Sequence, residues 1–271
     1  MLIEFIDALR IRCAPGARTL GFAHEAAAIA SRHRRVGASW GPHLAASRAV
    51  ILRGAARCQK HHRVLVIGAG ACLDVPVAEL AEIFAEVILA DVAVSTASRR
   101  WRRRLPGKVH PIAWDATGAL AILASSRREI ISADVERLFA SSDPGRPPQG
   151  EADLVVSANC LSQLGLIPAE QLTAAAFDDK LPARCAQAAA KRHVEWLAVR
   201  PSVRVLLSDV ARLDVASDGH ELVRRTIFEN LDLRLPDQCW YWDLAPIPEL
   251  SREWHRVHEV GAWIDELVSP R

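Results

Sequence analysis

The segment at residues 63–80, RVLVIGAGACLDVPVAEL, constrains the fold of this chain more than any other part of the sequence. An apolar run at residues 64–67 is followed at once by Gly68-Ala69-Gly70, and a helical pattern begins near Val77. A strand, a glycine turn and a helix in this order are typical of open α/β sheets, where the NH groups of the turn face a polar or anionic ligand. Taken alone, the segment also fits a tight turn that binds nothing.

Three further apolar runs, at residues 87–90, 153–158 and 203–208, have the length of buried strands, and a weaker run ends at Asp115. Helical patterns separate them. One apolar stripe recurs at helical spacing between the first two runs, through Val77, Leu80, Ala81 and Phe84. Another helix is expected at about residues 183–198, and a helix followed by a loop at residues 127–150. This alternation predicts a doubly wound, mostly parallel α/β sheet with right-handed crossovers.

The segment before the sheet, from Met1 to about Lys60, is rich in Ala and Arg and contains no strand-like run. Pro15-Gly16 and Gly41-Pro42 interrupt it, which favours several short helices. The 271 residues, half of them hydrophobic, suffice for one large domain with a helical extension. We therefore expect an N-terminal helical segment at residues 1–60 and a ligand-binding sheet domain at residues 61–271.

The overall charge gives little indication of a nucleic-acid partner, because the formal net charge is only +2. One local exception is the run at residues 99–104, RRWRRR, which could hold phosphates but is better explained as a solvated helix face. No apolar run reaches the length of a membrane-spanning helix, and acidic Glu4 and Asp7 do not fit a signal peptide. Neither nucleic acid nor a membrane is therefore expected as a partner.

The six cysteines show neither CxxC pairs nor histidines at metal-ligand spacing, so we expect no metal site and no disulfide framework. They are interpreted as reduced thiols of a cytoplasmic protein. Their positions are Cys13, Cys58, Cys72, Cys160, Cys185 and Cys239.

Polar residues follow the other strands where each one ends. Asp91-Val92 closes the second strand about twenty residues past the glycines, where a carboxylate can accept hydrogen bonds from both hydroxyls of an adenosine ribose. The alternative is that Asp91 caps a helix. Asp115-Ala116 follows the third strand and could accept the exocyclic amine of an adenine, and Asn159 follows the fourth. The carboxyl ends of parallel strands meet at one edge, so these residues predict a crevice for an adenosine-containing cofactor.

Through VLVIGAG, the Asp91 strand end, AWDAT and DLVVSANCLSQL, the chain resembles the class I S-adenosylmethionine (SAM)-dependent methyltransferases over roughly residues 63–210. The resemblance implies a Rossmann-like fold whose sheet finishes with an antiparallel pair, expected at residues 240–264. It also implies SAM as cofactor, with the Gly68 loop beside its methionine part, Asp91 on the ribose and Asp115 on the adenine. The activity implied is methyl transfer, here to an unidentified substrate that we expect to be a small molecule.

The sequence departs from the family pattern at three positions. Val66 stands where many members have an acidic residue, and Cys72 replaces a third glycine. Asp74 is expected to cap the following helix, and its charge would lie near the carboxylate of the cofactor. These departures leave open a binding or scaffold protein that does not methylate. An NAD-dependent oxidoreductase is a further alternative, which the missing third glycine disfavours.

Candidates for the substrate side lie in two places. Trp40, His43 and Arg48 surround an expected helix start at Pro42, although they also fit the surface of a docking helix. Gln163, together with Asn159, is placed to orient a substrate after the fourth strand. Methyl transfer from a sulfonium depends mainly on positioning the nucleophile, so no catalytic residue is obligatory and none is predicted. His193 lies on an apolar helix face and is expected to pack in the core. The tryptophans near the C-terminus are also expected to pack, although some of them could line a pocket; they are Trp240, Trp242, Trp254 and Trp263.

Overall fold

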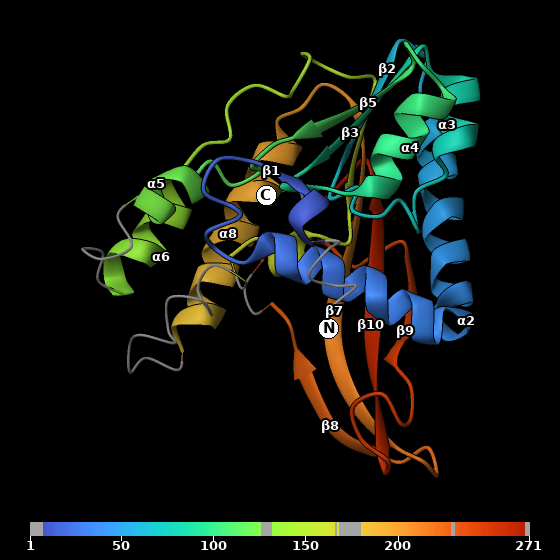
Figure 1. Ribbon diagram of the computed structural model, residues 1–271, viewed down its shortest axis with the longest axis vertical. Coiled ribbons are helices and arrows are strands. Elements are labelled where there is room, and N and C mark those ends of the chain that lie inside the picture. The colour runs from blue at the N-terminus through green and yellow to red at the C-terminus, as the bar shows by residue number, and fades with distance from the viewer. Residues whose placement is uncertain (1–7, 126–131, 166, 168–179, 229–230, 269–271) are drawn as a thin grey trace.

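The computed structural model of the chain describes residues 8–125, 132–165, 167, 180–228 and 231–268. Within these residues an eight-stranded sheet has the order β5-β3-β2-β6-β7-β10-β9, and β8 pairs with β7 (Figure 1). The parallel strands are β2 (Arg63–Ile67), β3 (Glu86–Asp91), β5 (Val109–Ala113), β6 (Leu154–Ala158) and β7 (Val203–Ala216). The antiparallel strands are β8 (Glu221–Thr226), β9 (Gln238–Ala245) and β10 (Trp254–Ile264).

The predicted doubly wound, mostly parallel sheet with a terminal antiparallel pair is therefore confirmed. From β2 the chain adds β3 and β5 on one side and then β6 and β7 on the other, so the strand order reverses between β2 and β6. Ligands bind to open α/β sheets at this reversal, outside the carboxyl ends of the strands.

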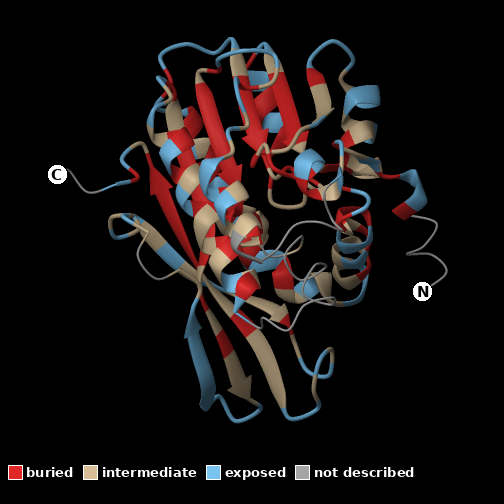
Figure 2. Cartoon of the chain, turned by 90° about the vertical axis from the view of Figure 1, so that its left-hand side faces the viewer, coloured by how far each residue is buried: buried red, intermediate tan, exposed pale blue. Residues whose placement is uncertain are grey.

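Successive residues of β2 point to opposite faces of the sheet, as the pleat of a strand requires. Val64 and Val66 pack in a cluster with residues of α2 (Phe22–Ala55) and α3 (Val77–Ile83). Leu65 and Ile67 pack in another cluster with residues of α8 (Leu181–Ala198). Helices on both faces thus bury the central strands completely, which explains why their sequences are unbroken apolar runs (Figure 2).

Other helices depart from the predicted boundaries. The apolar stripe that includes Phe84 belongs to α3, but the helix ends one residue earlier and Phe84 is its buried cap. The helix and loop expected at residues 127–150 are present as α6 (Ser132–Ser141) and the loop that follows it, while residues 126–131 lie outside the described part of the chain. A further helix, α5 (Leu120–Ser125), precedes them and was not predicted. The others are α4 (Thr96–Arg104) and the 3₁₀ helix η1 (Leu161–Gln163).

The N-terminal segment contains one long helix, α2, where several short ones were expected. Gly41 and Pro42 lie inside this helix, and its backbone leaves helical geometry at Val36 (φ −125°, ψ 16°). Here Ser39 Oγ donates to the Val36 carbonyl at 2.8 Å. The kink divides α2 into a first part, residues 22–35, and a second part that packs along the sheet (Figure 1).

A short strand, β1 (Arg12–Cys13), was also not predicted, and it pairs with β4 (Ala93–Val94) just after β3. Two residues are too few to show the alternation by which strands are recognised. None of the helices in the described residues is long and apolar enough to cross a membrane. The boundary at residue 60 stays a prediction.

Candidate functional site

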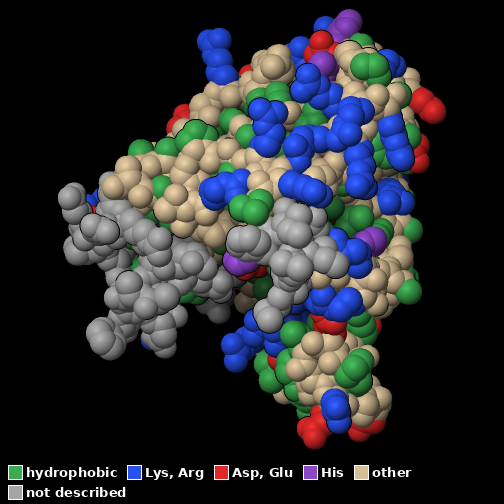
Figure 3. Space-filling view, viewed as in Figure 1, with side chains coloured by type: hydrophobic (Ala, Val, Ile, Leu, Met, Phe, Trp, Pro, Cys, Tyr) green, Lys and Arg blue, Asp and Glu red, His purple; other side chains and the backbone are tan. Residues whose placement is uncertain are grey.

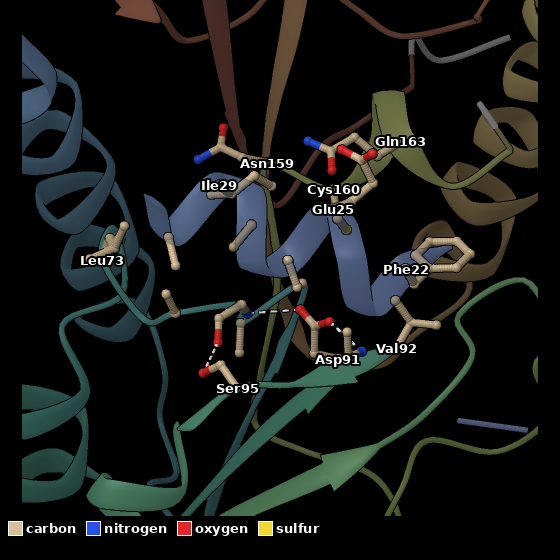
Figure 4. A pocket seen from close by; sticks show the side chains of 18 of the residues that line it. Phe22, Glu25, Ile29, Leu73, Asp91, Val92, Ser95, Asn159, Cys160 and Gln163 are labelled. Carbon is tan, nitrogen blue, oxygen red and sulfur yellow. Dashed lines mark hydrogen bonds between the residues drawn. The ribbon is translucent and has the colours of Figure 1, made fainter. Parts of the chain in front are cut away.

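A cavity of about 240 Å³ lies at the carboxyl ends of β2, β3 and β6, and the first part of α2 forms one of its walls (Figure 4). All but one of the residues proposed from the sequence to bind cofactor or substrate line it. On the cofactor side these are Gly68, Ala69, Gly70, Asp91, Val92, Asp115, Ala116 and Asn159, and on the substrate side Trp40, His43 and Gln163. The exception is Arg48.

The two glycines of the loop after β2 differ in how strongly the structure requires a residue without a side chain. Gly68 has φ +75°, and a Cβ there would lie 2.6 Å from Cys160 Cβ, so close packing against the chain after β6 excludes any side chain. Gly70 has φ +47°, but the nearest atom to a Cβ would be 3.8 Å away. At Cys72, where the family has a third glycine, a cysteine with φ 57° adopts the left-handed backbone that favours glycine.

The NH groups of this loop do not face the cavity, contrary to the sequence-based expectation. The amides of Gly68 and Ala69 donate to the Ala90 carbonyl, at 3.0 and 3.3 Å. The Gly70 amide donates to Asp91 Oδ2 at 2.7 Å, and Ser95 Oγ donates to the Gly70 carbonyl at 2.7 Å. The loop is therefore held by β3 and the residues after it, and these three amides are already used within the protein.

Asp91 lies at the centre of the cavity wall, and its carboxylate braces two loops. Oδ2 accepts from the Gly70 amide and Oδ1 from the Ala93 amide at 2.8 Å. It is not the cap of α4, because Ser95 fills that position and accepts from the Ser98 amide at 3.1 Å. Burial raises the pKa of Asp91 to about 6, against the opposing effect of the two amides. A carboxylate in this setting gains from any ligand that donates hydrogen bonds or carries positive charge.

Asp115 stands two residues beyond the end of β5 and organises the turn that leads into α5. Oδ1 accepts from the amide and the hydroxyl of Thr117, at 2.8 and 2.6 Å, and Oδ2 accepts from the Leu120 amide at 2.9 Å. A carboxylate oxygen offers two lone pairs, so only Oδ2 keeps one free. Asp115 thus has a clear structural role in addition to its place beside the cavity.

Asn159 and Asp74 form a polar pair on the opposite side of the loop. Asn159 has φ 49°, and its Nδ2 donates to Asp74 Oδ2 at 2.7 Å. Its Oδ1 is buried and has no hydrogen-bond partner. Burial raises the pKa of Asp74, while the hydrogen bond from Asn159 opposes this. Asp74 does not cap α3 as predicted, since that helix begins at Val77 without any side-chain cap.

We call these residues the strand-end region: Gly68, Gly70, Asp74, Asp91, Asp115 and Asn159. Among the described residues that line the cavity, four carry carboxylates and one carries a guanidinium. The acids are Glu25, Asp74, Asp91 and Asp115, and the base is Arg34. The cavity is therefore acidic, and it favours a ligand with net positive charge.

A second set of residues, the aromatic region, consists of Trp40, His43, Trp240 and Trp242. The His43 ring stacks on Trp242, with centroids 4.2 Å apart and an interplanar angle of 7°. Trp40 meets the same indole edge-on at 5.1 Å and donates from Nε1 to the Leu244 carbonyl at 3.0 Å. Trp240 donates from Nε1 to His43 Nδ1 at 3.0 Å. Three of these rings line the cavity, and Trp240 holds one of them in place.

Other sequence candidates lie elsewhere. Arg48 is exposed on α2, outside the cavity, and donates to the carbonyl of Leu73 in the loop. His193 is 2 % exposed in the core, with Nε2 2.9 Å from Ser157 Oγ, as its apolar helix face indicated. Gln163 lines the cavity from η1.

Several cavity residues were missed from the sequence. Phe22, Ala26 and Ile29 come from the first part of α2, and Ser95 follows β4 (Figure 4). The spacing of the three α2 residues at i, i+4 and i+7 indicates one helix face. Nothing local indicates that this face covers the end of a sheet formed later in the chain.

The arginine-rich run forms α4, on whose surface Arg100, Arg102, Arg103 and Arg104 are exposed. Figure 3 shows Lys and Arg side chains gathered over the face that carries α4. The run therefore forms an exposed helix face. All six cysteines lie in the described part of the chain, and no disulfide joins any two of them. Within the described residues, no group of three His, Cys, Asp or Glu side chains is placed to hold a metal ion.

Comparisons with known proteins give only distant likenesses. No family model matches the sequence, and no curated protein matches it. One similar solved structure is the 1,6-didemethyltoxoflavin-N1-methyltransferase of Burkholderia thailandensis, with 1,6-didemethyltoxoflavin and S-adenosylhomocysteine bound. It is 15% identical, the match covers 88% of this chain and 89% of that one, and the TM-score is 0.36.

Another is a SAM-dependent methyltransferase of Leishmania major, 13% identical, with 79% of this chain and 72% of that one covered and a TM-score of 0.30. The strand order defines the fold. With a doubly wound, mostly parallel sheet that ends in an antiparallel pair, the chain has a Rossmann-like α/β fold.

Proposed function

We propose that this chain binds SAM in the strand-end region and transfers its methyl group to a small-molecule acceptor. In this proposal Asp91 accepts from the ribose hydroxyls, and Asp115 with Ala116 borders the adenine. The Gly68 loop and Asn159 lie beside the methionine part of the cofactor. The acceptor enters from the side of Gln163 and the aromatic region.

The acidity of the cavity is the observation that carries this proposal. SAM has a sulfonium and an ammonium group against one carboxylate, so its net charge is positive, whereas a dinucleotide carries a negative pyrophosphate. Asp91 would repel a pyrophosphate, and three loop amides that could have bound one are engaged within the protein. An NAD-dependent oxidoreductase is therefore disfavoured on two independent grounds.

The hydrogen bonds of Asp91 leave room for the ribose. Each of its oxygens accepts one backbone amide and keeps a second lone pair, which is what a pair of vicinal hydroxyls requires. Asp115 keeps one lone pair for one donor, which matches the exocyclic amine of an adenine.

The chemical step needs little from individual side chains. When bound, SAM would supply the electrophilic methyl group, and the protein would hold the nucleophile in line with it. The first part of α2 forms a largely apolar wall that limits the access of water. We assign no general base.

Calorimetric titration with SAM, S-adenosylhomocysteine (SAH) and NAD tests the cofactor. We expect both adenosine thioether ligands to bind and NAD not to bind. Incubation with methyl-labelled SAM and a low-molecular-mass metabolite extract then tests the reaction, with label expected in the small-molecule fraction. Binding without label transfer would favour the scaffold alternative, and failure to bind SAM would refute the proposal.

A further inference from the structure

The aromatic region is a preorganised surface whose parts come from two distant segments. Trp40 and His43 are three residues apart on α2 and so share one face of the helix. Trp240 and Trp242 are two residues apart on β9 and share one face of the strand. The two faces meet, and the hydrogen bonds from Trp40 and Trp240 fix the rings in position. The rings are therefore held in place before any ligand binds.

The hydrogen bond from Trp240 decides where the proton on His43 lies. An indole NH can only donate, so His43 Nδ1, 3.0 Å from Trp240 Nε1, must present a lone pair. A neutral imidazole then carries its proton on Nε2. Burial lowers the pKa of His43 to about 4, so the ring is neutral at physiological pH. Asp209 and His258, the nearest charged or titratable neighbours, act on it in opposite directions.

His43 Nε2 has no hydrogen-bond partner among the described residues, and it is not among the polar atoms that are shut off from solvent. Because His43 lines the cavity and its Nε2 is not shut off from solvent, we infer that this nitrogen faces the space where an acceptor substrate would lie. It already carries the ring proton and so cannot act as a base there, and protonation of Nδ1 to form a cation would break the hydrogen bond from Trp240. The tautomer therefore makes His43 a hydrogen-bond donor.

We propose that His43 selects the methyl acceptor, donating from Nε2 to a carbonyl oxygen or an unprotonated ring nitrogen of a planar, unsaturated substrate. The ring walls of Phe22, Trp40, Trp114 and Trp242 line the same cavity and favour a flat apolar body. A substrate without an acceptor atom would leave a buried donor without a partner. This inference rests on the proposed function, because it leaves the strand-end region to SAM.

Two probes of equal size test the selection. Isoquinoline carries a ring nitrogen that accepts a hydrogen bond, and naphthalene has the same shape without it. We expect isoquinoline to bind about fivefold or more tightly than naphthalene in NMR titrations with SAH present at pH 8. His43→Phe keeps an aromatic ring and should bring the two affinities together. Trp240→Phe keeps His43 but frees its tautomer, so the preference should be reduced and not abolished.

The tautomer itself can be measured without any variant. The ¹⁵N chemical shifts of His43 in the unaltered protein should show Nε2 protonated and Nδ1 unprotonated. The opposite tautomer, or equal affinities for the two probes, would overturn the role of His43. Failure of SAH to bind in the same titrations would instead contradict the proposed function, so the two failures are distinguishable.

Discussion

The two ends of the cavity are built in different ways. The strand-end region comes from loops that directly follow β2, β3, β5 and β6, and its polar side chains brace one another or the backbone. The aromatic region joins α2 to β9, about two hundred residues later in the chain, and its rings hold one another. One end is acidic and hydrogen-bonded, and the other is largely apolar, with His43 Nε2 and the buried Trp242 Nε1 as donors that have no partner among the described residues.

This difference indicates a division of labour. A parallel sheet brings the carboxyl ends of its strands together whatever its sequence, so a cofactor site there follows from the fold. The aromatic region depends on which helix and which strand pack together there. Its residues can therefore change independently of the cofactor site and determine which substrate binds. Substitutions in the strand-end region should therefore leave substrate affinity largely unchanged, and substitutions in the aromatic region should leave cofactor affinity largely unchanged.

The largest effect is expected from Asp91→Ala. Two charge-assisted hydrogen bonds to the ribose are worth about 1.5 to 3 kcal/mol, so the affinities for SAM and SAH should both fall by about tenfold to a hundredfold. The two losses should be similar because both ligands carry the same ribose. Calorimetry on the folded variant measures both constants.

Asp91→Ala should also lower the melting temperature, since the amides of Gly70 and Ala93 lose their acceptor. A variant that is destabilised and still binds both ligands like the parent would mean that Asp91 only braces the loops. Asp91→Asn, which keeps the side-chain size, is the matched control for packing.

The next effect concerns pH. Because burial raises the pKa of Asp91 to about 6, the carboxylate is ionised above that pH and protonated below it. SAM affinity should therefore be constant from pH 7 to 8 and fall about tenfold by pH 5. SAH carries the same ribose, so its affinity should depend on pH in the same way, and titrations of SAM and SAH at several pH values measure this. Asp91→Asn should remove most of the pH dependence.

The stability of the unligated protein should change in the opposite sense. A carboxyl whose pKa is higher in the folded state than its model value of 3.8 binds its proton more tightly when folded. Its contribution to stability is thus present below about pH 4 and lost as the pH rises through about 6. A constant SAM affinity between pH 7 and 5 would contradict the assignment of Asp91 to the ribose.

A smaller effect is expected from Asp115→Ala. One hydrogen bond to a neutral amine is worth about 0.5 to 1.5 kcal/mol, so SAM affinity should fall by about twofold to tenfold. The melting temperature should also fall, because Thr117 and Leu120 lose their acceptor. A folded variant with unchanged affinity, measured by calorimetry, would leave Asp115 as a turn residue only.

The smallest effect is expected from Arg48→Ala, and it separates the two ends. Arg48 was grouped with Trp40 and His43 in the sequence, but it contacts the Leu73 carbonyl of the cofactor loop. An exposed hydrogen bond of this kind contributes little, so SAM affinity should change by about twofold or less. Isoquinoline binding should not change, and a change confined to isoquinoline would show that Arg48 serves the aromatic region after all.

Much of the strand-end region could be predicted because its residues carry local signals. Gly68, Asp91 and Asn159 each follow a strand, and strands buried on both faces are recognisable as apolar runs. Their detailed roles could not be predicted. The engagement of the Gly70 amide by Asp91, and the pairing of Asp74 with Asn159 in place of a helix cap, depend on loop geometry that several sequences of this composition could satisfy differently.

The sequence by itself determined the order of strands and helices, because burial on two faces demands unbroken apolar runs and glycine turns between them. It also determined which polar residues stand near the ends of β2, β3, β5 and β6, and so which side chains meet at one edge of the sheet, although β5 ends at Ala113, two residues before the expected Asp115. Only the tertiary structure decided that α2 continues through Pro42 with a kink at Val36, and that this brings Trp40 and His43 onto Trp240 and Trp242. The physical reason is that contacts between segments two hundred residues apart arise from packing of the whole core, which leaves no periodic trace in either segment.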